Sequence, residues 1–499
     1  MWIQSGLAVN MLLLRTVWCF LVLFVTTTAS LVPGGDITQD SSLTLLQTGP
    51  HGSELYEVVG ESNYNDNIQL INLKADTSYN QGYDYATLLG SAALDNWDNV
   101  LKALLGDFYN AATVHIVEKH LDKQWENFMS KDVPSSYIDE LDGMSDASKK
   151  MRLRGDVGKI ASRVIVVANF PSDLDDLKYI YKDEREDPQS SQMETKVWEA
   201  INKKWSSFHC SNYGAWGSRT VDGRLFTARN LDWLSDLGIQ KYKLVTVHHP
   251  PSGYSHITIG WVGVWGAIAG MSQEGLTVHE ANLESDDITF QGFPWMLRLR
   301  EVMAKARTLD EAMKLWNSTQ NTVGFNHGIG SVEDGTAILL ETMMHNTAVF
   351  ADNDPREAEY IYDGENIGRP RKDAIFRTNH GYDPYSISHF QWNGTGAMRY
   401  SVERYFLFAD TFDYYENAQT KIDVPQAINI TALVGDKGEE CMTTCEPPYP
   451  NGANVLSVTY DPSKLDVYIA WENGHRSDDS WSPAACNTYM RINLKGVFT

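Results

Sequence analysis

Residues 208–233, FHCSNYGAWGSRTVDGRLFTARNLDW, place one cysteine, three arginines and two aspartates in one short stretch near the middle of the chain. A cysteine attacks an acyl carbon only as the thiolate, so a reactive Cys210 requires a base and a positively charged neighbour. A cysteine that begins a chain carries its own base, because a terminal α-amino group has a pKa of about 7.7–8.0. If the bond between His209 and Cys210 is cut, Cys210 acquires such an amine. These residue types therefore favour acyl transfer by a thiol.

The thiol itself can make this cut. Attack of the Cys210 thiol on the His209 carbonyl gives a thioester, which water then releases. Cys210 opens the β-rich half of the chain, shortly after residues 182–196, KDEREDPQSSQMETK, which are charged, polar and interrupted by Pro188, as in a linker. We therefore expect autocleavage between His209 and Cys210.

The cysteine count leaves two interpretations of Cys210 open. Cys19 lies in an N-terminal apolar run, and four cysteines follow it. If all four pair, Cys210 is part of a disulfide, as is usual in a secreted protein. Otherwise Cys210 is a free thiol, and one structural bridge forms among Cys441, Cys445 and Cys486. The count alone favours full pairing.

The elements on the two sides of the linker differ. From Tyr83 to Lys131 apolar residues recur at helical spacing, SSYIDELDGMSDASKKM predicts a further helix, and RVIVVANF predicts a buried strand. Residues 31–80 are polar and are expected to form a loose leader. After the linker, short β-rich runs alternate with paired helical patterns, which favours an α+β fold with helices stacked on antiparallel sheets. We expect a signal peptide at 1–30, a mostly helical α chain at 31–209 and a catalytic β chain at 210–499.

The N-terminus and the overall charge predict the compartment. MLLLRTVWCFLVLFVTTTAS has an arginine beside an apolar run and then small residues, as in a cleaved secretory signal; a retained signal anchor is the alternative. Glycosylation sequons at Asn317, Asn393 and Asn429 fit the secretory route. The formal net charge of −24 argues against nucleic-acid binding. We expect a secreted or lysosomal glycoprotein, whose contact with membrane surfaces is at most transient.

Four motifs from Cys210 to about Phe406 resemble the choloylglycine hydrolase and acid ceramidase group of N-terminal nucleophile hydrolases. This group includes N-acylethanolamine acid amidase, penicillin V acylase and the acyltransferase that completes penicillin. The motifs are Cys210-Ser211 followed by ARNLDW, then GMSQEGLTVHEANL, FRTNHGYD and SVERYF, in this order. The resemblance implies an αββα four-layer sandwich, autoproteolysis and amide hydrolysis without a cofactor or a metal.

The resemblance also gives roles to five residues beside Cys210. Arg229 and Asp232 match an R-x-x-D pair: Arg229 would favour the thiolate, and Asp232 would orient the new amino group. Asn282 and Asn379 match two asparagines whose amides would face the oxyanion, where one lost donor costs about 2.7–4 kcal/mol of barrier. Arg404 would bind a polar substrate end or brace the network. Each of these residues also has an ordinary structural explanation, such as a surface salt bridge or a turn.

Other candidate residues fit less well. The pair His248-His249 lacks further metal ligands at a set spacing, and His279-Glu280 lacks the second histidine of a zinc helix. His327 or His380 could serve as the base of a papain-like site, but the sequence around Cys210 does not match that class.

We therefore expect a hydrolase that acts on linear amides of small-molecule or lipid N-acyl compounds, with the α and β chains of one precursor held together. Acyl transfer to an amine uses the same thioester. One alternative is an ester hydrolase related to the phospholipase B-like group. Another, of a different class, is a secreted binding or structural protein with Cys210 in a disulfide.

Overall fold

The computed structural model describes residues 38–60, 67–170, 201, 209–438, 445–447, 449 and 452–498. The predicted signal peptide at 1–30, the predicted linker at 182–196 and Cys441 lie outside these residues. Among the helices of the described part, none combines the length and apolar character that a bilayer crossing requires.

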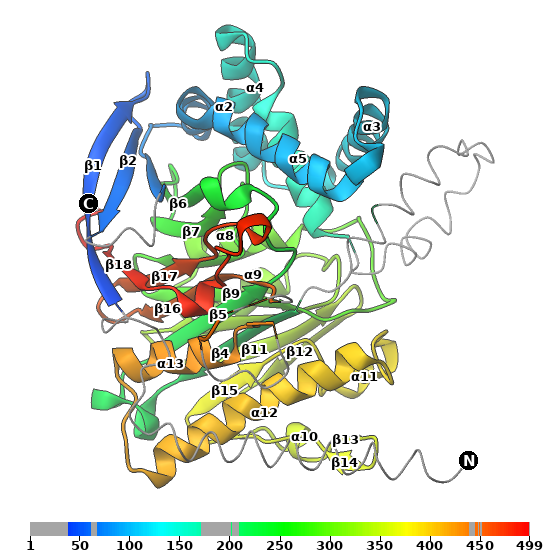
Figure 1. Ribbon diagram of the computed structural model, residues 1–499, viewed down its shortest axis with the longest axis vertical. Coiled ribbons are helices and arrows are strands. Elements are labelled where there is room, and N and C mark those ends of the chain that lie inside the picture. Colours follow the sequence, from blue (N-terminus) through cyan, green and yellow to red (C-terminus); the bar gives the residue numbers. More distant parts are fainter. Residues whose placement is uncertain are drawn as a thin grey trace, which may run out of the picture.

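The central strands form one continuous order of 16 strands, which folds into two facing layers called here the first and the second sheet (Figure 1). The first sheet is antiparallel throughout and has the order β15-β4-β5-β16-β17-β18. Its strands are β4 (His209–Ala215), β5 (Phe226–Asp232), β15 (Ala374–Arg377), β16 (Asn454–Asp461), β17 (Asp466–Trp471) and β18 (Tyr489–Asn493).

The second sheet has the order β6-β7-β8-β9-β10-β11-β12, again antiparallel. Its strands are β6 (Lys243–His248), β7 (His256–Trp261), β8 (Ala269–Ser272), β9 (Leu276–Asn282), β10 (Phe325–Ser331), β11 (Thr336–Met343) and β12 (Asn346–Phe350). The two sheets face each other: β4 and β5 contact β9, and the Thr227 hydroxyl donates to the Thr277 hydroxyl over 2.9 Å.

Helices cover the outer faces of both sheets. Helices α12 (Gly396–Asn417) and α13 (Val424–Val434) pack on the first sheet, and α8 (Trp295–Lys305) and α9 (Leu309–Trp316) pack on the second. The result is the predicted αββα sandwich. Smaller elements complete this part of the chain: α10 (Pro355–Ala358), β13 (Ile361–Tyr362), β14 (Glu365–Asn366) and α11 (Pro384–His389).

The N-terminal half is mostly helical, as expected, and its helices lie at the top of Figure 1. It contains α2 (Ser78–Leu105), α3 (Ala111–Asn127), α4 (Ser135–Met151) and α5 (Val157–Ala168). Helices α2 and α4 approach closely at two glycines. A Cβ on Gly82 would lie 1.9 Å from the carbonyl oxygen of Glu140, and one on Gly143 would lie 2.0 Å from that of Tyr79.

The strand prediction for RVIVVANF is wrong, because residues up to Ala168 of this segment belong to α5. Its valines and isoleucine favour a strand by intrinsic propensity. However, the Asp156 side chain caps the helix by accepting from the Lys159 N–H, and Val157, Ile160 and Ala161, which share one helix face, are buried. Tertiary packing therefore overrides the local preference.

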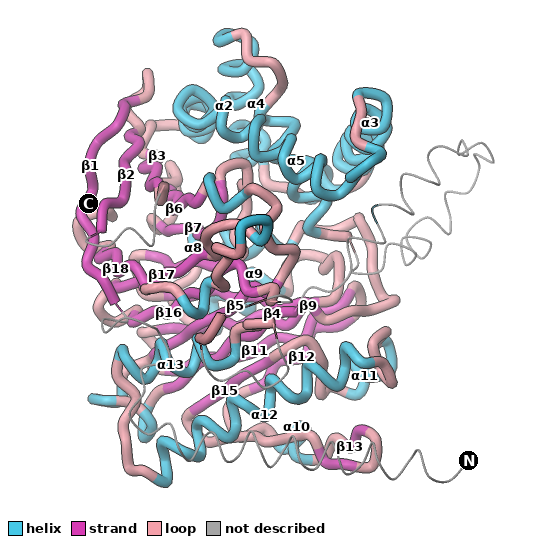
Figure 2. The backbone as a smooth tube through the Cα atoms, in the orientation of Figure 1, coloured by secondary structure: helices cyan, strands magenta, loops and turns pink. Residues whose placement is uncertain are grey.

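The prediction of a loose leader at 31–80 is also wrong for its described residues. These form β1 (Thr38–Thr48), β2 (Glu54–Gly60) and β3 (Gln69–Leu73). Strand β1 pairs in parallel with β18 of the first sheet, and β3 pairs in parallel with β6 of the second (Figure 2). Strand β2 pairs with both β1 and β3, so these three strands of the N-terminal half join the β18 edge of the first sheet to the β6 edge of the second.

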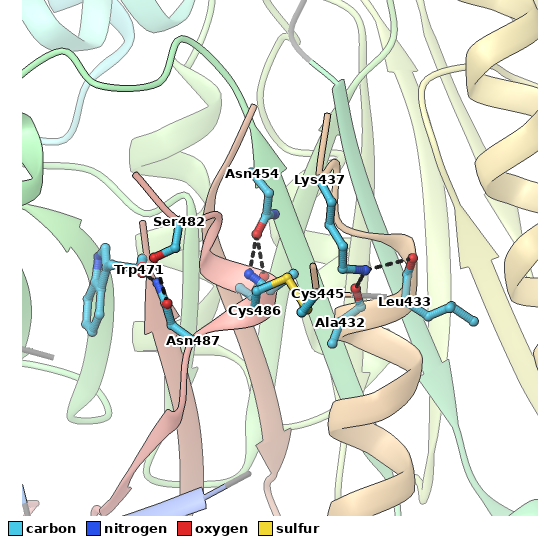
Figure 3. Close-up of a disulfide and its surroundings, with 11 residues drawn as sticks. Ala432, Leu433, Lys437, Cys445, Asn454, Trp471, Ser482, Cys486 and Asn487 are labelled. Atoms are coloured by element: carbon cyan, nitrogen blue, oxygen red, sulfur yellow. Dashed lines mark hydrogen bonds between the residues drawn. A yellow bond between two sulfur atoms is a disulfide. The ribbon is translucent and has the colours of Figure 1, made fainter. Parts of the chain in front are cut away.

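A disulfide between Cys445 and Cys486 joins the segment after α13 to the turn before β18 (Figure 3). The same region holds a buried lysine, Lys437, whose ammonium donates to the carbonyls of Ala432 and Leu433 at the end of α13. Cys210 is a buried free thiol. The interpretation with Cys210 in a disulfide is therefore wrong, and one bridge forms between two of the three predicted cysteines.

Candidate active site

Cys210 is the second residue of β4 and lies in the middle of the sandwich. Strand β4 is flanked by β5 and β15, and only 1% of the Cys210 side chain is exposed. In the register with β5, His209 is opposite Asp232, and Asn212 is opposite Arg229. The pairing of one hairpin thus brings the cysteine and both residues of the R-x-x-D motif together.

The sulfur of Cys210 is close to two hydrogen-bond donors and is influenced by the charge of one nearby acid, Glu280. Arg229 Nη2 is 3.6 Å from Sγ, and the main-chain N–H of Asn282 donates to the same sulfur. Burial, followed by the negative charge of Glu280, raises the pKa of the thiol to about 12, although Arg229 and the Asn282 N–H act in the opposite direction. The thiol of Cys210 is therefore protonated at neutral pH.

Glu280 on β9 is a site residue that the sequence analysis did not identify. Its Oε1 accepts from Arg229 Nη2 over 2.6 Å, and both side chains are almost fully buried. Burial raises the pKa of this carboxyl, while Arg229 lowers it. As a motif, His279-Glu280 is informative only for a zinc helix. What indicates a role for Glu280 is its place in the apolar strand LTVHEANL, because a buried acid requires a buried partner.

Asp232 is the last residue of β5 and lies opposite His209, the residue before the bond expected to be cut. Its Oδ1 accepts from Asn454 Nδ2 over 2.7 Å and from the Asp436 N–H over 3.2 Å. Its Oδ2 is buried and has no hydrogen-bond partner within the described residues, although Arg404 Nη1 lies 3.9 Å away. Burial raises the pKa of Asp232 to about 7, Arg404 opposes this, and Asp436 adds to it. A buried acceptor with an unused oxygen suits a newly formed amine.

Asn379 and Arg404 hold the backbone of Cys210. Asn379 Oδ1 accepts from the Cys210 N–H over 2.8 Å and from Arg404 Nη2 over 2.7 Å. Arg404 Nη1 donates to the Cys210 carbonyl oxygen over 2.6 Å. Asn379 is itself fixed by Ser401, whose hydroxyl accepts from the Asn379 N–H over 2.7 Å. Side chains from α12 and from the loop after β15 thus position the backbone of Cys210.

Asn282 reaches the site in a way that the sequence did not predict. Its side-chain amide donates to Glu284 over 3.1 Å, while its carbonyl oxygen accepts from Asn379 Nδ2 over 2.8 Å. The main-chain N–H of Asn282 is the group that faces the sulfur. The structure therefore brings all five predicted residues into one network around Cys210, with Asn282 acting through its backbone.

The remaining predicted site residues lie elsewhere. Asn317 and Asn393 are exposed, whereas Asn429 is half-buried in α13. His327 packs against Trp316 and Phe325, and His380 bonds to Ser401 and Tyr382, so neither is placed as a base for Cys210. No group of metal-ligating side chains suited to holding an ion occurs within the described part of the chain.

The sequence matches the model of the acyl-coenzyme A:6-aminopenicillanic acid acyl-transferase family over residues 218–476. Two curated proteins of Dictyostelium discoideum also match. Protein dcd1B is 32% identical over 149 residues, which cover 29% of this chain and 30% of that protein. Protein dcd1A is 27% identical over 156 residues, which cover 29% of this chain and 35% of that protein. The chain thus spans about a third of the length of these curated relatives.

The solved structures that match this chain share little sequence with it. A mutant conjugated bile acid hydrolase from Clostridium perfringens has a TM-score of 0.37 and 14% identity, covering 57% of this chain and 93% of that one. The N-acylethanolamine-hydrolyzing acid amidase ortholog of Caenorhabditis elegans has a TM-score of 0.33 and 12% identity, covering 51% and 93%.

Proposed function

Because this chain belongs to the acyl-coenzyme A:6-aminopenicillanic acid acyl-transferase family, we propose that it is a cysteine N-terminal nucleophile enzyme that hydrolyses linear amides. The observation that carries the proposal is the surroundings of the Cys210 nitrogen. Asn379 Oδ1 already accepts its N–H, and the unused Oδ2 of Asp232 lies across the hairpin from the preceding residue. These acceptors suit an α-amine better than a peptide nitrogen, which has only one hydrogen to donate.

The first step of the proposal is autocleavage. The Cys210 sulfur attacks the carbonyl carbon of His209, the C–N bond breaks, and the nitrogen of Cys210 takes up the thiol proton. Water then hydrolyses the thioester, which leaves a carboxylate on His209 and a free thiol and amine on Cys210. The raised thiol pKa of the uncut chain fits a slow, single reaction of this kind.

Turnover of substrate follows the same path. The α-amine accepts the thiol proton, Arg229 stabilises the thiolate, and the sulfur attacks the substrate carbonyl. The Asn282 N–H, which faces the sulfur, and the side-chain amide of Asn379 would donate to the developing oxyanion. The α-ammonium then protonates the leaving nitrogen, and water hydrolyses the thioester. A fatty-acyl amide, a ceramide-like lipid or an acylated amino acid would each satisfy this chemistry.

Acyl transfer to an amine is the second candidate, because the name of the matching family describes an acyl-transferase. The two reactions share the thioester and differ only in whether water or an amine releases the acyl group. Hydrolysis of one acyl amide with and without an added primary amine separates them: a transferase forms the new amide at the expense of the free acid.

The compartment and chain association are parts of the same proposal. The Cys445–Cys486 disulfide and the exposed sequons at Asn317 and Asn393 support passage through the secretory route, to a secreted or lysosomal destination. After cleavage, the pairing of β3 with β6 and of β1 with β18 would keep the two chains together.

Paired amide and ester substrates with one acyl chain test the reaction class. The purified protein is expected to release acid from the amide, and replacement of Cys210 by alanine is expected to abolish this. Turnover of the ester alone would contradict an amidohydrolase and favour an ester hydrolase of the phospholipase B-like kind.

A further inference from the structure

The side chain of His209, the last residue before the bond expected to be cut, fills an aromatic slot. Its ring centroid lies 4.9 Å from that of Tyr400 in an edge-to-face arrangement and 5.6 Å from that of Trp392. Its Nδ1 is buried and has no hydrogen-bond partner within the described residues. The imidazole is therefore held as an apolar ring. The pKa of His209, which burial and the nearby Arg404 lower to about 3, agrees with a neutral ring.

The slot adjoins the nucleophile. Tyr400 stands four residues before Arg404 on α12, and the Arg404 guanidinium lies 4.8 Å from the centre of the Tyr400 ring. The same guanidinium donates to the carbonyl oxygen of Cys210. Trp392 lies in the loop that precedes α12 and packs against Phe390. One wall of the slot is thus part of the network that fixes Cys210.

The chemistry of autocleavage relates this slot to the substrate. In the thioester of the first step, the acyl group on sulfur is the residue His209. In turnover, the acyl group of the substrate is bonded to the same sulfur, with its carbonyl oxygen facing the same donors. A substituent on the substrate carbonyl carbon therefore points where the side chain of His209 lay, once that residue has left.

Building on the proposed function, we propose that the Trp392–Tyr400 slot is the acyl subsite of the cut enzyme and selects an uncharged flat ring joined to the carbonyl carbon through two further carbons. This spacing is that of histidine itself, in which Cα and Cβ separate the carbonyl from the ring. The acyl class is thus a 3-arylpropanoyl group. Edge-to-face contact with Tyr400 and tilted ring contact with Trp392 favour a ring over a saturated chain of similar length. The neighbouring Arg404 disfavours a cationic group.

Variants of His209 test the slot before any substrate is involved. His209→Phe keeps a flat uncharged ring and is expected to self-cleave within about threefold of the natural rate, measured by the appearance of the β chain. His209→Lys places a cation beside Arg404 and is expected to self-cleave at least tenfold more slowly. Equal rates for these two variants would overturn the inference.

Turnover by the cut enzyme gives the second test. The probes are amides of 7-amino-4-methylcoumarin with 3-phenylpropanoyl, hexanoyl and 3-(trimethylammonio)propanoyl groups. The expected kcat/KM for the aryl probe exceeds that for hexanoyl about tenfold, and the cationic probe is the poorest. Tyr400→Leu and Trp392→Leu are expected to reduce this preference to below threefold, mainly through KM. Tyr414→Leu, an exposed tyrosine on the same helix, is the matched control.

The outcomes separate the two proposals. Equal turnover of the aryl and hexanoyl probes, or a preference that survives both leucine variants, contradicts the slot but leaves amide hydrolysis intact. Absence of turnover of every probe by protein whose β chain begins at Cys210 contradicts the proposed function, and the slot with it. Each variant is first checked for a β chain that begins at Cys210, so that kcat/KM is measured only on cut protein.

Discussion

The main-chain N–H of Cys210 donates to Oδ1 of Asn379 over 2.8 Å, so the nitrogen of the bond expected to be cut already lies against a side-chain acceptor. Arg404 donates a second hydrogen bond to the same oxygen, and the Ser401 hydroxyl accepts from the main-chain N–H of Asn379. These hydrogen bonds fix the position of the Cys210 nitrogen. Such positioning would serve catalysis if the nitrogen becomes a reacting group.

Replacement of Asn379 by alanine removes this acceptor and one of the two donors proposed for the oxyanion. We expect autocleavage to slow and kcat to fall about 10²–10³-fold, as when a single oxyanion donor is lost. Asn417→Ala, at the exposed end of α12, is the control. An Asn379→Ala protein that cleaves and turns over at the natural rate would show that the hydrogen bond is only structural.

The thiol of Cys210 should be far less reactive before the cut than after it. Its pKa of about 12 leaves almost no thiolate at neutral pH in the uncut chain, whereas the cut chain supplies an adjacent amine. Iodoacetamide labelling of a partly processed sample at pH 7, read by intact mass, is expected to modify the cut form at least a hundredfold faster. Equal labelling of both forms would contradict a latent thiol.

Glu280 is expected to hold Arg229 in place. Glu280→Gln leaves a buried guanidinium without its charged partner, which costs about 3–5 kcal/mol when one member of a buried pair is removed. The thiol pKa should fall at the same time, because the charge of Glu280 raises it. Thermal unfolding and the pH dependence of alkylation measure the two effects.

Glu333→Gln is the matched control for Glu280. Glu333 forms an exposed ion pair with Arg307 over 4.0 Å, and loss of such a pair changes stability by at most about 1 kcal/mol. A Glu280→Gln protein no less stable than Glu333→Gln would indicate that the buried pair contributes nothing net.

Asp232 should make the folded protein less stable as the pH rises. Its folded pKa of about 7 is above the ordinary value of 3.8, so between these values the folded state binds more protons than the unfolded state. Stability from this group therefore falls from about pH 4 to about pH 7. Asp232→Asn cannot ionise, so in the uncut Cys210→Ala background its Tm relative to Cys210→Ala alone should rise over this range. A difference in Tm that does not change with pH would contradict a buried, protonated Asp232.

The two chains should remain together after the cut for two reasons. Strands of the N-terminal half pair with both sheets, and a buried ion pair joins the N-terminal half to the catalytic half. Glu140 of α4 and Arg300 of α8 form that pair, with two hydrogen bonds of 3.0 Å each. Size-exclusion chromatography of the cut protein is expected to show one peak with both chains. Glu140→Ala is expected to lower the denaturant midpoint of unfolding, and separation of the natural chains without denaturant would contradict this account.

The sequence predicted most where local pattern and spacing decide the structure. Helix α4 spans the predicted segment from Ser135 to Met151, and the strands that carry Arg229, Asp232 and Asn282 lie where the β-rich runs are. The five site residues could be located because their motifs follow one another along the chain and the strands bring them together.

What could not be predicted depends on contacts distant in sequence. Strand β3 forms by parallel pairing with β6, and no local pattern at residues 69–73 reveals that partner. Glu280 belongs to the site only because Arg229 crosses from the other sheet to reach it. Asn282 was expected to act through its amide, but the amide is turned toward Glu284 and the backbone faces the sulfur.

The N-terminal residue of the β chain in purified, active protein is the most direct test of the central claim. Intact mass and N-terminal sequencing are expected to show two chains, one beginning at Cys210, while a Cys210→Ala precursor stays whole. Full amidase activity in a single chain unbroken between His209 and Cys210, or cutting of the Cys210→Ala precursor at that same bond, would contradict the mechanism.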